Sequence, residues 1–170
     1  RKHWIVVVKG TFDVCPDGSL VLSDEPVPPL VEPVYFGEAG ASSLRYEADI
    51  GGPKAATDVV VNGTAHAPAG KPTTRLHVAL HVGRVRKIIA VTGDRDYRRF
   101  AGLVTPSSAQ PFVTMPIVYE RAFGGFDAHD PEPQNQRLDT RNPVGRGCAV
   151  RPRSLVGTPV ANLAIPGQPW

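Results

Sequence analysis

The residues with the most obvious chemistry are Asp127, His129 and Asp130, which lie within four positions of one another, with Glu120 seven positions before them. Carboxylates and an imidazole can hold Ca²⁺ or act as general acid and base. The same residue types also suit exposed turns, and Pro131 follows directly after Asp130. The cluster is therefore a candidate site, with a solvated polar loop as the favoured alternative.

His77 and His81 form a second candidate, a metal site. On a helix this spacing would bring the two imidazoles to about 6 Å from each other, whereas in a strand it places them about 13 Å apart. Apolar residues alternate with polar ones around both histidines, which indicates a strand. We therefore predict neither a metal ion nor a cofactor.

Motifs of nucleophilic catalysis are missing from the sequence. It contains no Gly-x-Ser-x-Gly elbow, no phosphate-binding Gly loop and no His-Glu-x-x-His, and Ser42-Ser43 after Gly40 is typical of a turn. We expect a binding protein, not an enzyme. Two alternatives stay open: a hydrolase using Glu120 with Asp127 or Asp130, and a carbohydrate-binding β-sandwich. The second would need an exposed aromatic surface, and we expect most of the 12 aromatic residues to point inward.

The charge pattern bears on the partner. The net charge is +3, and Arg supplies 14 of the 19 basic residues. Five arginines lie close together with only Asp139 among them: Arg137, Arg141, Arg146, Arg151 and Arg153. A nucleic-acid surface would interleave such a patch with stacking aromatics, and none occurs between Phe126 and Trp170. An acidic protein is the better expectation, and no apolar run is long enough to cross a membrane.

The elements that must position these residues are predicted to be strands. Residues 4–14 alternate as a long strand, 15–18 form a Pro-Gly turn, and 19–22 return. Residues 57–67 indicate one strand with a kink. Residues 74–82 and 85–92 form a hairpin around Gly83-Arg84, with Leu76, Val78, Leu80 and Val82 facing inward.

Further along, residues 112–123 indicate another strand, with Pro116 marking an edge or a bulge. Residues 126–170 are mostly loop. The prediction is a single all-β domain over residues 1–170, an antiparallel β-sandwich or open barrel with long Pro- and Gly-rich loops and little helix. Cys15 and Cys148 are expected to be reduced thiols of a cytosolic protein.

Two charged groups remain without an obvious role. Glu120 and Arg121 would point to opposite faces of an extended strand, so each would need another partner. The same question applies to Arg45-Tyr46-Glu47. Structural ion pairs and contacts to a bound protein are both open for these residues.

Several motifs, in order, resemble a bacterial family of domains of unknown function. They are 35–38 (YFGE), 42–49 (SSLRYEAD), 56–63 (ATDVVVNG), 93–95 (GDR), 115–116 (MP), 119–125 (YERAFGG), 141–147 (RNPVGRG), and Asn162-Leu163 with Pro166. Members of that family tend to be encoded beside type VI secretion effectors. They are thought to act as adaptor-chaperones that load an effector on the secretion spike.

The resemblance implies a non-enzymatic, cytoplasmic adaptor that binds an effector and spike proteins. It also implies that this chain is the N-terminal part of a longer domain. Seven motif residues are the expected organising or binding residues: Arg45, Glu47, Tyr119, Glu120, Arg121, Asn142 and Arg146. Whether they contact the effector or hold the loops is open.

Overall fold

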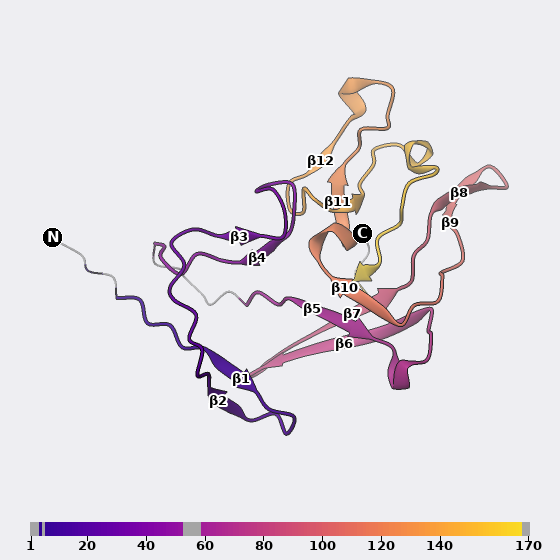
Figure 1. The fold of residues 1–170 in the computed structure, drawn as a ribbon. Coiled ribbons are helices and arrows are strands. Elements are labelled where there is room, and N and C mark those ends of the chain that lie inside the picture. Colours follow the sequence, from indigo (N-terminus) through magenta and orange to yellow (C-terminus); the bar gives the residue numbers. More distant parts are fainter. Residues whose placement is uncertain (1–3, 5, 53–58, 168–170) are drawn as a thin grey trace. The chain divides into compact units, whose positions relative to one another are not determined.

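A computed structural model describes residues 4, 6–52 and 59–167, and it consists of short strands joined by loops and 3₁₀ turns (Figure 1). The strands are β1 (Phe12–Val14), β2 (Leu20–Leu22), β3 (Val34–Tyr35), β4 (Leu44–Tyr46), β5 (Gly63–His66), β6 (Arg75–Val82), β7 (Val85–Thr92), β8 (Tyr97–Phe100), β9 (Leu103–Pro106), β10 (Thr114–Ile117), β11 (Phe123–Phe126), β12 (Leu138–Asp139), β13 (Arg146–Gly147) and β14 (Leu163–Ala164). The 3₁₀ turns are η1 (Pro68–Gly70), η2 (Tyr119–Arg121), η3 (Pro133–Asn135) and η4 (Pro152–Leu155).

The all-β prediction is confirmed. The ladders between strands are antiparallel except that of β11 and β13, which run parallel, and a single parallel bridge joins Ala122 to Leu163. None of the small sheets in the described ranges closes into a barrel. No helix among the described residues is long and apolar enough to cross a membrane.

The chain divides into two compact units. Unit 1 comprises the described residues of 1–39 and 44–60, and contains β1 to β4. Unit 2 comprises 40–43 and the described residues from 61 onward, and contains β5 to β14.

In unit 1 the predicted turn and return strand are confirmed, but the long strand over residues 4–14 is wrong. The Gly18 N–H donates to the Cys15 carbonyl at 2.9 Å, and Gly18 has a φ of +82°. Only Phe12–Val14 pair as strand β1, against β2. Beyond Leu22 the returning chain contains Pro26, Pro28 and Pro29, and proline cannot donate to a ladder. The alternation in 6–11 therefore meets no partner strand.

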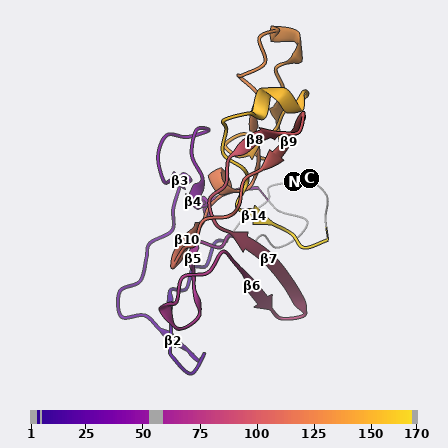
Figure 2. The same ribbon diagram turned by 90° about the vertical axis from the view of Figure 1, so that its right-hand side faces the viewer.

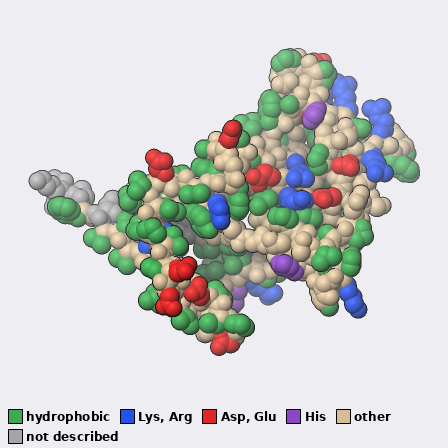
Figure 3. Space-filling model, viewed as in Figure 1, with side chains coloured by type: hydrophobic (Ala, Val, Ile, Leu, Met, Phe, Trp, Pro, Cys, Tyr) green, Lys and Arg blue, Asp and Glu red, His purple; other side chains and the backbone are tan. Residues whose placement is uncertain are grey.

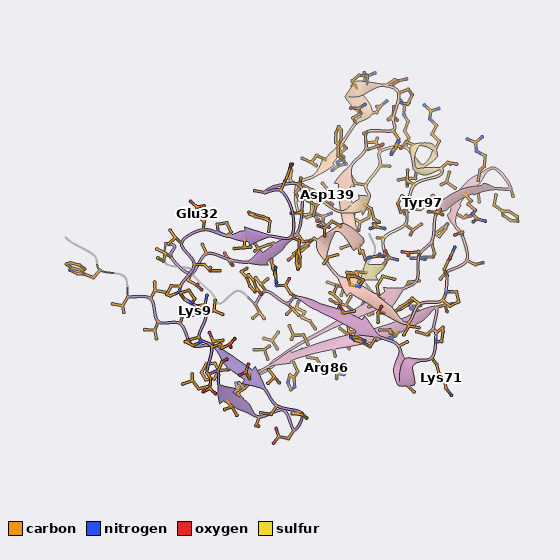
Figure 4. The ribbon with its side chains drawn as sticks, in the orientation of Figure 1. Lys9, Glu32, Lys71, Arg86, Tyr97 and Asp139 are labelled. Atoms are coloured by element: carbon orange, nitrogen blue, oxygen red, sulfur yellow. The ribbon has the colours of Figure 1, made fainter. Side chains whose placement is uncertain are left out.

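A clamp around Asp49 ties unit 1 together. The Lys9 ammonium lies 2.6 Å from Asp49 Oδ2 and also donates to the Pro28 carbonyl at 3.2 Å (Lys9 is labelled in Figure 4). Asp49 Oδ2 accepts the Leu30 N–H at 2.7 Å as well. No described residue of unit 1 is buried, so polar clamps and short ladders hold it, not an apolar core.

Unit 2 is built on the hairpin of β6 and β7, the longest pair of strands in Figures 1 and 2. The predicted hairpin is confirmed: Val82 pairs with Val85 across Gly83, whose φ is +57°. Leu76, Val78 and Leu80 are half-buried as expected, whereas Val82 at the tip is exposed. β14 adds to the other edge of β7.

The core of unit 2 is small and lies where three pairs of strands meet. Its buried members are Ala65 on β5, Val91 on β7, Met115 on β10 and Leu163 on β14. Partly buried side chains pack around them: Leu76, Val78, Ile89, Phe112, Ile117 and Ala122. These residues come from segments far apart in the sequence, so the core joins both ends of unit 2.

Two predicted strands are shorter than expected. Within residues 57–67 the ladder is β5 alone, and residues 57–58 lie outside the described residues. The single strand over 112–123 is wrong, because η2 separates β10 from β11. Pro116 does sit in a two-stranded sheet, where its missing N–H disrupts little. The long loop prediction for 126–170 holds apart from three two-residue strands and the turns η3 and η4.

Candidate functional site

The break between β10 and β11 brings five of the seven predicted residues together. η2 supplies Tyr119, Glu120 and Arg121, and the chain returns to it with Asn142 and with Arg146 on β13. Because η2 is a 3₁₀ turn, the expectation that Glu120 and Arg121 lie on opposite faces of a strand does not apply.

Glu120 is bound by Ser43. Its Oε1 accepts the Ser43 N–H at 2.7 Å, and its Oε2 accepts the Ser43 hydroxyl. That hydroxyl also accepts the Tyr119 N–H at 2.8 Å, and Ser43 is only 3% exposed. Burial raises the pKa of Glu120. The hydrogen bonds from Ser43 act in the opposite direction and contribute to a net pKa below the ordinary value. Ser43 and Glu120 therefore form a charged clamp, in which the serine hydroxyl donates to Glu120 and accepts from Tyr119.

Arg146 fastens the backbone of the same turn. Its Nε donates to the Glu120 carbonyl at 2.6 Å, and its backbone N–H donates to the Ala122 carbonyl at 3.0 Å. Burial is the main reason why the Arg146 pKa lies below the ordinary arginine value. The guanidinium thus satisfies the Glu120 carbonyl of η2, and the Arg146 backbone satisfies the carbonyl of the next residue but one.

Asn142 bridges the turn and the glycine strand. Its Nδ2 donates to the carbonyls of Tyr119 and Phe123, each at 2.9 Å. Its own carbonyl accepts the N–H groups of Gly125 at 2.8 Å and Gly145 at 3.1 Å. A Cβ on Gly125 would collide with the Gly145 carbonyl, so close backbone approach explains these glycines.

Arg121 leads to a second polar network. Its Nη1 donates to Asp94 Oδ1 at 2.9 Å and to Asn162 Oδ1 at 3.2 Å. Asn162, 1% exposed, donates through Nδ2 to Asp94 Oδ1 at 3.0 Å and to the Thr92 carbonyl at 2.9 Å. Burial raises the pKa of Asp94, and the hydrogen bonds from Asn162 and Arg121 lower it to a net value below the ordinary one.

Three of the seven predicted residues are exposed: Tyr119, Arg45 and Glu47. The Tyr119 residue is 57% exposed, although its backbone belongs to the network. Arg45 and Glu47 belong to unit 1 and are exposed. The Arg45 guanidinium lies 5.8 Å from the Phe36 ring centre and 5.2 Å from that of Tyr46, within the range of cation–π contacts.

The acidic loop is not the solvated loop favoured from the sequence. Asp127 and Asp130 are 2% and 1% exposed. Asp127 accepts the Ser154 hydroxyl at 2.9 Å, and Asp130 accepts the Glu132 N–H at 3.0 Å. Local turn formation drives this burial, since each aspartate caps a backbone N–H two residues on. In the described part of the chain no three acidic, His or Cys side chains form a group that could hold a metal ion.

Two further arginines of the cluster over residues 137–153 also have partners within unit 2. Arg141 pairs with Asp139 at 2.8 Å, which lowers the Asp139 pKa to about 2 (Asp139 is labelled in Figure 4). Arg151 lies 3.2 Å from Glu132 and 3.9 Å from Asp130. These arginines therefore fix loops of unit 2. His77 and His81, by contrast, are exposed on β6, as the strand prediction required.

Sequence reasoning missed Ser43, Asp94 and Asn162 as members of these networks. All three lie within the motif series that carries the family resemblance (42–49, 93–95 and Asn162-Leu163), and that membership was the signal that could have selected them. The expectation that most aromatic side chains point inward is wrong. Trp170 lies outside the described residues, and of the 11 aromatic residues that the structure describes, seven are exposed: Trp4, Phe12, Phe36, Tyr46, Phe100, Tyr119 and Phe126. Cys15 and Cys148 are both free thiols.

The chain was compared with protein families, curated proteins and solved structures. The model of a family described as "Uncharacterized protein conserved in bacteria (DUF2169)" matches residues 1–170. No curated protein and no solved structure matches the chain.

Proposed function

The chain belongs to DUF2169, a family of uncharacterized proteins conserved in bacteria, and we propose that it is a non-enzymatic adaptor that binds a type VI secretion effector in the cytoplasm. In this role it holds the effector and presents it to the secretion spike. The effector and the spike enter this proposal through the motif series, which resembles that of adaptor-chaperones.

One observation carries the binding role. Unit 1 has no buried residue among those described, while 17 of its large apolar residues are exposed. Water-exposed apolar area on this scale is unfavourable, by roughly 25 cal/mol for each Å², and it marks a surface that a partner covers. A stable adaptor complex buries about 1,600 Å² of surface in total, about half of it on each partner.

The networks of unit 2 support the same role. The polar side chains of Glu120, Arg146 and Asn142 form hydrogen bonds with backbone groups and with Ser43 within the unit. Such an arrangement supports a rigid scaffold that carries an exposed binding surface. A hydrolase, in contrast, needs its acid and nucleophile open to substrate.

Affinity capture from the native bacterium tests the proposal. We expect the untruncated protein to recover one dominant secreted protein together with spike components, identified by mass spectrometry. The Glu120→Gln variant serves as a control for chemistry. A turnover that the wild type shows and Glu120→Gln loses would contradict the adaptor role, as would a capture that yields no specific protein while effectors are expressed.

A further inference from the structure

Strand β1 is the visible end of a longer strand pattern. Residues 6–14 alternate as a strand would, yet only 12–14 are paired. Val6 and Val8 are 84% and 90% exposed. β-branched residues in an extended, unpaired segment are an edge that another strand can complete.

The register of the hairpin shows which edge of β1 is open. The Cys15 N–H donates to Ser19, and the Ser23 N–H donates to Thr11, each at 2.9 Å. Hydrogen-bonded pairs alternate with non-bonded pairs in an antiparallel ladder. Phe12 and Val14 therefore sit at non-bonded positions, and their backbone N–H and C=O groups point away from β2. These groups bond to no other described residue.

The same register gathers four apolar side chains on one face. Phe12 lies opposite Leu22 and Val14 opposite Leu20, and side chains approach most closely at such non-bonded pairs. We call Phe12, Val14, Leu20 and Leu22 the apolar platform. Its members are 54%, 74%, 64% and 67% exposed. A strand added at β1 would extend this platform and cover part of it.

The β1–β2 hairpin and the segment that follows it carry only acidic charges. Residues 10–44 contain six carboxylates and no Lys, Arg or His: Asp13, Asp17, Asp24, Glu25, Glu32 and Glu38. Figure 3 shows acidic side chains gathered among hydrophobic ones over β1 and β2. Hydrogen bonds from Ser19 lower the Asp17 pKa, so that carboxylate stays ionised at neutral pH. At this surface a cationic partner segment is favoured and an anionic one is repelled, in contrast to the acidic partner expected from the arginine cluster.

We infer that β1 takes up a basic, amphipathic segment of the partner as an added β-strand, with residues 6–14 forming one continuous strand in the complex. Apolar side chains of the added strand pack beside the apolar platform, and its Lys or Arg side chains face the surrounding carboxylates. The inference rests on the proposed adaptor role and names the surface and the chemistry of the segment that is bound.

Hydrogen–deuterium exchange of the full chain tests the inference with a defined probe. The probe is a short capped peptide that alternates Val with Lys, and the matched control peptide alternates Val with Glu. We expect saturable binding of the Val–Lys peptide, slowed amide exchange in residues 6–14, and no binding of the Val–Glu peptide.

Val8 provides the matched protein variants. In a continuous strand the Val8 N–H points to the same open edge as those of Phe12 and Val14. Val8→Pro removes that donor at an exposed position, and we expect peptide affinity to fall about tenfold or more. Val8→Thr keeps the donor and the β-branched shape, so affinity should stay near that of the wild type. Thermal unfolding of both variants checks that unit 1 stays folded.

Several outcomes would overturn the inference. These are protection of residues outside 6–14, equal binding of both peptides, no binding, or unchanged affinity of Val8→Pro. Concentration-dependent dimerisation of the wild type that Val8→Pro abolishes would also overturn it, since a second copy would then occupy the edge. If the wild type still captures an effector from the native bacterium in any of these cases, the adaptor role stands and only the binding surface is wrong.

Discussion

Ser43 holds the Glu120 carboxylate with two hydrogen bonds across 77 positions of the sequence, one from its backbone N–H and one from its hydroxyl. The clamp joins the 40–43 segment to η2 within unit 2. It explains why a glutamate can lie half-buried in the 3₁₀ turn that precedes β11.

Removing the serine hydroxyl should destabilise unit 2. Ser43→Ala leaves the enclosed Glu120 Oε2 without that donor and frees the Tyr119 N–H, so we expect a loss of roughly 2 kcal/mol in the free energy of unfolding. Chemical denaturation measures it. Ser108→Ala, at an exposed serine, is the control and should change stability by less than about 0.5 kcal/mol. Equal effects of the two variants would contradict the clamp.

The same clamp predicts a pH dependence. The pKa of Glu120 is lowered in the folded protein: burial raises it, and the hydrogen bonds from Ser43, together with the Glu120 backbone and the charge of Arg146, bring it below its ordinary value. A lowered carboxyl pKa contributes stability above the unfolded pKa, and that contribution is lost as pH falls through the folded pKa. Denaturation midpoints from pH 7 to 3 should therefore fall more steeply for the wild type than for Glu120→Gln. Parallel curves would show that Glu120 does not titrate as described.

Three glycine substitutions separate backbone strain from collision. Gly157→Ala meets open space at a φ of +86°, and should cost about 1 kcal/mol for the left-handed backbone. Gly93→Ala meets the Gln110 carbonyl at a position without a positive φ, so its loss of stability measures collision alone. Gly125→Ala combines a φ of +89° with collision against the Gly145 carbonyl, and should cost on the order of 3 kcal/mol or more. Stabilities from urea unfolding should rank Gly157→Ala above Gly125→Ala. The opposite order would contradict the close approach of β11 to the 142–147 loop.

Asn162 and Arg121 should behave as one unit. Asn162→Ala removes the side-chain donor to the Thr92 carbonyl, one of the two donors to Asp94 Oδ1 and one of the two acceptors of Arg121 Nη1, while the Arg121–Asp94 bond remains. We expect it to cost roughly 2 kcal/mol. A double-mutant cycle with Arg121→Ala should give an interaction energy of about 1 kcal/mol, because the two side chains share Asp94. Additive losses would indicate that the two side chains act independently.

Tyr119 and Arg146 distinguish a binding surface from its scaffold. Arg146→Ala removes the donor to the Glu120 carbonyl and should lower the melting temperature. Tyr119→Ala removes an exposed ring and leaves the backbone bonds in place, so its melting temperature should hold. If η2 is part of the effector surface, Tyr119→Ala weakens capture of the effector without loss of stability. Unchanged capture would place the effector elsewhere.

The hairpin of β6 and β7 could be predicted because every signal for it is local. Alternation sets the faces, and Gly83 supplies the positive φ of the turn. The same local pattern failed for residues 4–14, where a strand needs a partner and the Pro-rich return offers none. The single strand predicted over residues 112–123 failed too, because the 3₁₀ turn η2 at Tyr119–Arg121 separates β10 from β11.

The sequence by itself determined the all-β class, the central hairpin and the set of motif residues worth attention. Only the tertiary structure decided what those residues do. Glu120 finds Ser43, Arg146 finds the Glu120 carbonyl, and Asn162 finds Arg121 and Asp94. Each bond joins positions at least 26 apart in the chain. Periodicity reports which face of an element a side chain occupies, whereas a hydrogen-bond partner depends on which loops the fold brings together.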